Sequence, residues 1–161
     1  MGAAYTGIYG EIGMNEPKIP RGIRNNNPGN IELSRDVWVG QAEHQTDGRF
    51  IQFNEPVYGI RALMKVLLNY QKLHKLKTIR RMIHRWAPPH ENKSVDYSLF
   101  VAQRMGIGVA VPFSFDRKKL IHMAEAITRF ENGENKDGLP YWYSPIIFGQ
   151  AADMALGLKD T

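Results

Sequence analysis

One carboxylate in this chain, Glu131, stands where a glutamate could act as a general acid. It follows Leu120 by eleven residues, and eleven residues at 100° each return to within about 20° of the same helix face. A partly desolvated carboxyl group at the end of an apolar stripe holds its proton more readily, as a general acid near neutral pH must. The alternative is a helix-end carboxylate that only bonds a neighbouring amide or arginine. The stripe that Glu131 extends consists of Leu120, Met123, Ala124 and Ile127.

Glu91 is the second candidate catalytic residue. It lies just before a helix that Ser94 can cap, so it could instead compensate the positive end of that helix dipole. Glu32, Glu43 and Glu55 fall in or beside a predicted β-hairpin, where the second wall of a cleft would stand. Glycosidic cleavage needs a protonated acid and a group that stabilises or traps the resulting cation.

The sequence lacks the residues that several other classes of catalytic and binding site require. The chain has no cysteine, which excludes disulfides, thiolate zinc sites and cysteine nucleophiles. It has no phosphate-binding loop, dinucleotide-binding fingerprint, nucleophile elbow or His-Glu-x-x-His motif. The five histidines are not spaced as a metal pair on one helix face. We therefore expect neither a metal nor a cofactor.

The charge balance is basic, with 21 Lys and Arg against 16 Asp and Glu, and much of the excess falls between Lys65 and Arg85. A basic surface favours nucleic acid, anionic lipid or an anionic cell wall, whereas a solvated helix face would serve only solubility. Both interpretations stay open. No specific nucleic-acid partner is expected, because no recognition motif is present and the helix there also carries core residues, namely Ile79, Met82, Ile83 and Trp86.

The elements that must position Glu131 follow from turn residues and periodicity. Residues 25–30 consist of residue types that favour turns. Short β-like segments follow at 31–33, 37–39 and 49–53, with a hairpin turn at 47–48. Helical spacing predicts a helix over 57–73 and one near 148–156. Three more are bounded by caps and stops: Thr78 to Pro88, Ser94 to Gly106, and Asp116 to Gly133. The expected fold class is α+β, mostly α, with a small β-hairpin region followed by a helical lobe.

Short blocks of sequence carry a family resemblance. They are RGIRNNNPGNI at 21–31, WxG at 38–40, FxxF at 50–53, GIRA at 59–62, RWAPPxEN at 85–92, Tyr97, and ENG at 131–133. Together these blocks resemble a phage-associated family of lysozyme-like virion proteins and peptidoglycan hydrolases. The resemblance implies a lysozyme-like muralytic domain over 21–133. Outside it, residues 1–20 contain Gly and Pro without periodicity and are expected to form an N-terminal arm, and residues 134–161 are expected to form a C-terminal extension that packs on the same domain.

In many enzymes of the lysozyme superfamily, a helix that ends in the catalytic Glu precedes an Asn-rich loop, a hairpin and a helical lobe. Here the loop and hairpin come first and the helix ending in Glu131 comes last, an order that resembles a circular permutation. The resemblance places Glu131 in the acid position. Tyr58, Trp86 and Tyr143 could stack on a sugar, although most aromatic side chains pack in the core. The substrate-binding residues that we expect are Asn25, Asn26, Asn27, Asn30, Trp38, Tyr97 and Trp142.

The sequence thus predicts a phage peptidoglycan glycosidase, a lysozyme or lytic transglycosylase, that cleaves the β-1,4 bond between N-acetylmuramic acid and N-acetylglucosamine. The alternative is a non-catalytic, lysozyme-like virion structural or cell-wall-binding module. The expected partners are bacterial peptidoglycan and other virion proteins, and the expected state is a monomer. Without a transmembrane segment or signal peptide, we expect an endolysin or virion enzyme that acts in the periplasm from the virion or the host cytoplasm.

Overall fold

The computed structural model describes residues 19–87, 94–135, 137–139 and 141–158 of the protein. These residues are mostly helical, and none of their helices is long and apolar enough to cross a membrane. The expected arm over 1–20 lies almost wholly outside them. The helices are α2 (Arg21–Arg24), α3 (Pro56–Lys72), α4 (Ile79–Trp86), α5 (Ser94–Met105), α6 (Arg117–Asn132) and α7 (Pro145–Leu156).

Local sequence sets the helix ends. The Thr78 hydroxyl accepts a hydrogen bond from the amide of Arg81 at the start of α4, and the Asp116 carboxylate caps α6 in the same way. Gly133, with a φ of 76°, ends α6 because a left-handed backbone angle suits glycine. These predicted boundaries are confirmed. Ser144 caps α7, which therefore begins a few residues before the predicted 148.

The segment 31–53 is less regular than the expected hairpin. In the described part of the chain no extended strand forms, and this segment contains two isolated antiparallel bridges, Glu32 with Phe50 and Gln41 with Phe53. The stretch 49–53 therefore pairs briefly on both of its edges. A regular ladder does not develop because side chains form hydrogen bonds with several of the backbone groups that a ladder would pair. For example, the Asp47 carboxylate accepts hydrogen bonds from the backbone amides of residues 49 and 50.

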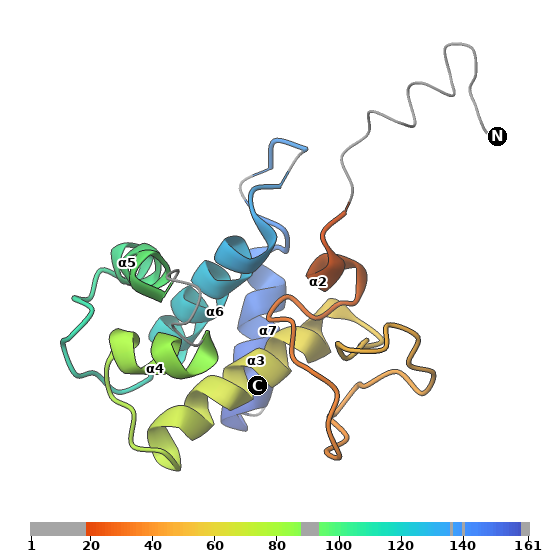
Figure 1. Ribbon diagram of the computed structural model, residues 1–161, viewed down its shortest axis with the longest axis horizontal. Coiled ribbons are helices and arrows are strands. Elements are labelled where there is room, and N and C mark those ends of the chain that lie inside the picture. Colours follow the sequence, from red (N-terminus) through yellow and green to blue (C-terminus); the bar gives the residue numbers. More distant parts are fainter. Residues whose placement is uncertain (1–18, 88–93, 136, 140, 159–161) are drawn as a thin grey trace.

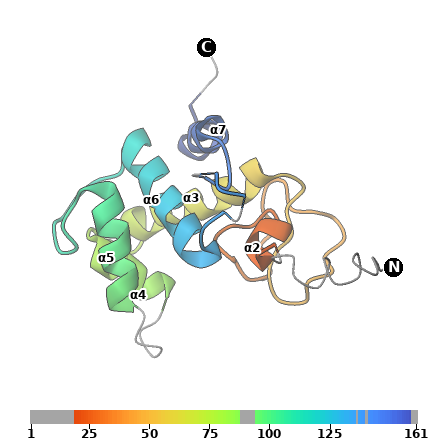
Figure 2. The same cartoon turned by 90° about the horizontal axis from the view of Figure 1, so that it is seen from above.

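The main hydrophobic core joins the helices into one packed unit. It combines buried side chains of α3, α4, α5 and α6 with those of α7, so the C-terminal segment contributes to the same core as the rest. The α7 residues in this core are Phe148, Ala151, Ala152 and Ala155. In the two views, α4 and α5 lie on one side of α3 and α6, whereas α2 and the loop that follows it lie on the other (Figures 1 and 2).

We call residues 25–55 the loop lobe. A second, smaller cluster holds this lobe against α3, because Ile51 and Phe53 of the lobe are buried together with Ala62 of that helix. Trp38 and Tyr58 pack against the cluster from its rim. At the start of α3, Gly59 lies so close to the carbonyl of Asn26 that an added Cβ would collide with it. The loop lobe is therefore fixed to the helical body by close packing.

Candidate functional site

A cleft of about 610 Å³ separates the loop lobe from the helices, and Glu131 lines it. The helical wall includes Val66 and Tyr70 of α3 and Trp86 at the end of α4. The segment 31–53 faces the C-terminal end of α6 across this space, because Glu131 lines the cleft together with Glu32 and Phe50. The wall on the loop side consists of Gly29, Asn30, Ile31, Glu32, Arg49 and Phe50.

Both carboxylate oxygens of Glu131 have partners from distant parts of the chain. The Tyr97 hydroxyl of α5 donates a 2.9 Å hydrogen bond to Oε2, and Nδ2 of Asn30 lies 3.4 Å from Oε1. Tyr97 is almost fully buried, and this burial, together with the negative charge of Glu131, raises the pKa of its phenol well above the usual value. The phenol therefore stays protonated near neutral pH and remains a donor that orients the Glu131 carboxylate.

The next residue, Asn132, fastens the end of α6 to the loop lobe. Its buried amide donates to the carbonyl oxygens of Pro28 and Thr128, each at 2.9 Å. Gly22 of α2 packs directly beneath, since a Cβ there would come within 2.6 Å of the Asn132 side-chain oxygen. The helix that carries Glu131 is thus fixed against the wall that it faces.

The predicted asparagine run divides into one cleft residue and three structural residues. Asn30 lines the cleft, whereas the Asn26 amide donates to the backbone of Phe53 at 3.0 Å. Asn27 is fully buried, and its amide donates to the carbonyl oxygens of Ile31 and Ile51. These bonds close the loop lobe on itself and direct the carboxamides away from the cleft.

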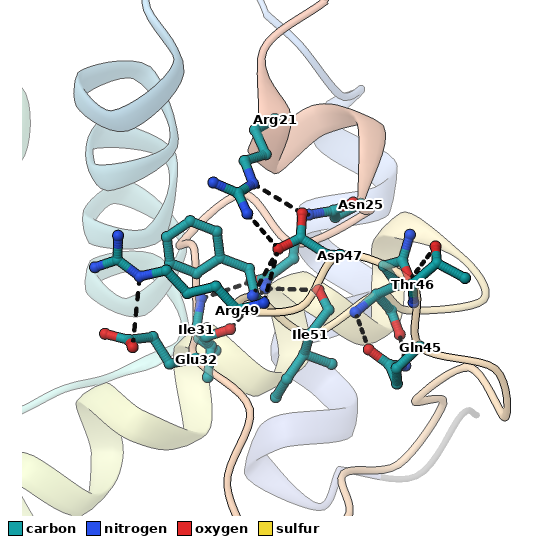
Figure 3. Close-up of polar contacts among 12 residues, drawn as sticks. Arg21, Asn25, Ile31, Glu32, Gln45, Thr46, Asp47, Arg49 and Ile51 are labelled. Atoms are coloured by element: carbon teal, nitrogen blue, oxygen red, sulfur yellow. Dashed lines mark hydrogen bonds and ion pairs between the residues drawn. The ribbon is translucent and has the colours of Figure 1, made fainter.

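Asn25 belongs to an ionic contact behind the cleft wall (Figure 3). Its amide donates to Asp47 at 2.9 Å, and the Arg21 guanidinium donates to both oxygens of the same carboxylate, at 2.8 and 2.6 Å. These bonds, with the backbone amide of Phe50, hold the pKa of Asp47 far below its usual range. Arg49 projects next to this contact, and its Nε lies 3.6 Å from Glu32.

The three predicted aromatic residues lie outside the cleft lining. Trp38 packs against the small cluster of the loop lobe. Tyr97 is buried in a stack with Phe130, at 3.8 Å between ring centroids, and holds Glu131. Trp142 donates from its indole nitrogen to the carbonyl of Gly133 at 2.7 Å, which fastens the chain after α6. Tyr97 and Trp142 thus hold the end of α6, whereas Trp38 packs within the loop lobe.

Other residues that the sequence did not single out as substrate-binding line the cleft instead. Trp86, considered among the possible sugar-stacking residues, lies against Gly29, where an added Cβ would stand only 3.0 Å from the indole ring. Tyr70 and Arg49 carry no local signal, because their place in the cleft depends on the rotation of α3 and on the course of the loop lobe. The positions of Trp86 in the RWAPPxEN block and of Phe50 in the FxxF block are the signals that could have indicated their roles.

Glu91, the second candidate acid, lies outside the described residues. Within the described ranges, no group of three or more His, Asp or Glu residues could hold a metal ion. The site that the structure does describe is therefore one half-buried glutamate, held by a phenol and a carboxamide, in a cleft with aromatic and charged walls.

No family model matches this chain. Over 132 residues, however, it is 37% identical to Protein P5 of Pseudoalteromonas phage PM2, and the match covers 80% of this chain and 79% of that protein. The phage origin of the relative agrees with the phage setting expected from the sequence. The chain belongs to the same family as Protein P5 of phage PM2.

Proposed function

We propose that this protein is a phage peptidoglycan glycosidase in which Glu131 is the general acid for cleavage of the β-1,4 bond between N-acetylmuramic acid and N-acetylglucosamine. The observation that carries the proposal is the position of Glu131, with both oxygens held, in an open cleft between two walls. Membership of a phage protein family supports the setting. The lysozyme-like family and the permuted order of its elements are part of the same proposal.

The walls of the cleft suit a chain of sugars. Trp86 and Tyr70 offer aromatic surface to the apolar faces of sugar rings, while polar groups lie among them for hydroxyl and amide groups. The cleft is open, as a site for an internal bond of a long polymer must be. Arg49 and Glu32 stand on the wall opposite the helices and bring charge to the same space.

In this mechanism the protonated Glu131 gives its proton to the glycosidic oxygen as the bond from that oxygen to the anomeric carbon breaks. In a transglycosylase, the C6 hydroxyl of the same muramic acid then attacks the anomeric carbon. Its proton returns to Glu131, which regenerates the acid and leaves a 1,6-anhydro sugar. In a lysozyme, water takes the place of the hydroxyl and a reducing sugar results. Glu32, on the opposite wall, is the carboxylate available to assist that route.

Purified peptidoglycan sacculi provide the test. We expect the protein to clear sacculi in a zymogram and to release soluble fragments that mass spectrometry identifies as disaccharide-containing muropeptides, with periplasmic peptidoglycan as the natural substrate. An anhydro end would identify a transglycosylase, and a reducing end a lysozyme. Sacculi that bind the protein without being cut would favour the non-catalytic virion or wall-binding module instead.

A further inference from the structure

A basic surface lies beside the cleft, in a part of the chain without acidic residues. Residues 56–90 contain eight Lys and Arg but no Asp or Glu. We call the exposed members around α4 the basic face. Among the residues that the structure describes, none of them forms an ion pair with a carboxylate. The basic face consists of Lys72, Lys75, Lys77, Arg80, Arg81 and Arg85.

Burial of the apolar side of α4 determines which residues point outward. Ile79, Met82 and Ile83 are fully buried in the main core. The exposed residues of this short helix are consequently three arginines and one histidine, namely Arg80, Arg81, His84 and Arg85. The core therefore fixes the direction in which these cations point, and no carboxylate in the described part of the chain forms an ion pair with them.

The exposed residues of α4 line a hollow of about 420 Å³, to which Leu76 contributes an apolar side chain. Among the residues that the structure describes, its lining therefore includes three guanidinium groups and an imidazole but no carboxylate. A guanidinium presents paired N–H donors that match the oxygens of a phosphate. Arg85 lies roughly 6 Å beyond Arg81 along the helix axis, since each residue adds about 1.5 Å. The cations around the hollow are thus suited to successive phosphate groups.

We propose that the basic face binds the phosphate backbone of a nucleic acid, independently of its base sequence. A DNA duplex carries one negative charge per about 1.7 Å, so several cations can contact phosphates at once. The carboxylates of peptidoglycan are more widely separated on flexible peptides. A bilayer presents a broad, level surface, whereas the arginines of the basic face stand around a hollow on one short helix. This proposal does not depend on glycosidase activity.

Fluorescence anisotropy with a labelled DNA duplex tests the proposal. We expect the logarithm of the association constant to fall linearly with the logarithm of the salt concentration, with a slope of about −0.9 for each phosphate contact. Two duplexes of unrelated sequence should bind with similar affinity. The double variant Arg80→Gln/Arg81→Gln should reduce the magnitude of this salt slope by about 1.8, and it should weaken binding at 0.1 M salt by about tenfold or more. Lys72→Gln/Lys77→Gln should act in the same direction and provides a second test should the first variant unfold.

A double variant of equal charge on other parts of the chain provides the matched control. Arg35→Gln/Lys118→Gln removes two exposed cations outside the basic face, and we expect it to leave the salt slope nearly unchanged. Equal losses in both double variants would overturn the proposal in favour of a bulk charge effect. Absence of duplex binding by the wild type at low salt would also overturn it. So would a basic-face variant that loses binding to sacculi or to phosphatidylglycerol vesicles but still binds DNA as the wild type does.

Discussion

The side chain of Asn132 donates a hydrogen bond of 2.9 Å to the carbonyl oxygen of Pro28, a residue 104 positions earlier in the chain. Through this bond the end of α6 is joined to the asparagine-rich turn. Glu131 and Asn30, one on each side of the bond, consequently reach the same cleft. The geometry of the proposed acid therefore depends on a buried carboxamide that does not itself line the cleft.

We predict that Asn132→Ala destabilises the fold by about 1–3 kcal/mol, because the buried carbonyl of Pro28 loses its donor. Denaturant unfolding followed by circular dichroism measures this change. Asn135→Ala is the control, since Asn135 is bonded only near the surface and its loss should cost no more than about 0.5 kcal/mol. Equal stability of Asn132→Ala and the wild type would show that this bond does not hold the two walls together.

Tyr97→Phe should lower kcat for peptidoglycan cleavage by about tenfold, because the phenol that orients Glu131 contributes one hydrogen bond to a charged group. KM should change little, since Tyr97 is buried and does not line the cleft. Steady-state kinetics on a soluble glycan fragment separate the two parameters. A rise in KM at unchanged kcat would mean that Tyr97 acts in substrate binding instead.

Trp86→Leu should weaken binding of a muropeptide oligomer by about tenfold, because the cleft loses the largest aromatic surface of its helical wall. Isothermal titration in a cleavage-deficient background measures the change. Trp38→Leu provides the comparison, since Trp38 packs in the loop lobe away from the cleft. If the Trp38 variant lost more affinity than the Trp86 variant, the substrate would follow a different path across the protein.

The ionic contact of Asp47 should make the fold sensitive to acid. The pKa of Asp47 is lower in the folded protein than in the unfolded chain, where it is about 3.9. Its stabilisation is therefore complete above this value and is lost as the pH falls toward the folded pKa. Asp47→Asn should lower Tm at pH 7 and differ progressively less from the wild type below about pH 4.

Thermal melts from pH 7 to pH 2 test this expectation. Glu43→Gln also removes one negative charge from the loop lobe, but at an exposed position, and its Tm should stay close to that of the wild type throughout. A constant difference in Tm between wild type and Asp47→Asn at every pH would contradict the electrostatic explanation.

The helices could be predicted because their signals are local. Thr78 and Asp116 each bond an amide three residues ahead, and Gly133 ends α6 through its own backbone angle. The position of Glu131 on the stripe of α6 follows from helical periodicity in the same way. These features depend on neighbours within one or two turns, and the sequence specifies them directly.

The roles of the asparagines and aromatic residues could not be predicted in this way. Turn chemistry indicates that residues 25–30 form a turn, but not that Asn27 bonds Ile51, 24 residues away, while Asn30 meets Glu131. The regular hairpin fails for a related reason, since side chains such as Asp47 take backbone groups that a ladder would use. Likewise, whether Tyr70 or Tyr97 enters the cleft depends on how each helix is rotated in the packed core.

The Glu131→Gln variant tests whether this side chain donates the proton in glycosidic cleavage. Gln has nearly the same shape and retains a carbonyl oxygen that can accept the Tyr97 hydrogen bond, so the fold and Tm should change little. It cannot give up a proton, and loss of general-acid assistance costs about 10²–10⁴ in rate. Glu91→Gln is the companion variant and should retain most of its turnover if Glu91 only supports the helix that follows.

The decisive measurement is the rate at which each protein reduces the turbidity of purified sacculi. We predict rapid clearing by the wild type, clearing by Glu91→Gln at a similar rate, and almost none by Glu131→Gln at unchanged Tm. Full activity of Glu131→Gln together with an inactive Glu91→Gln would assign the acid to Glu91 and contradict the account.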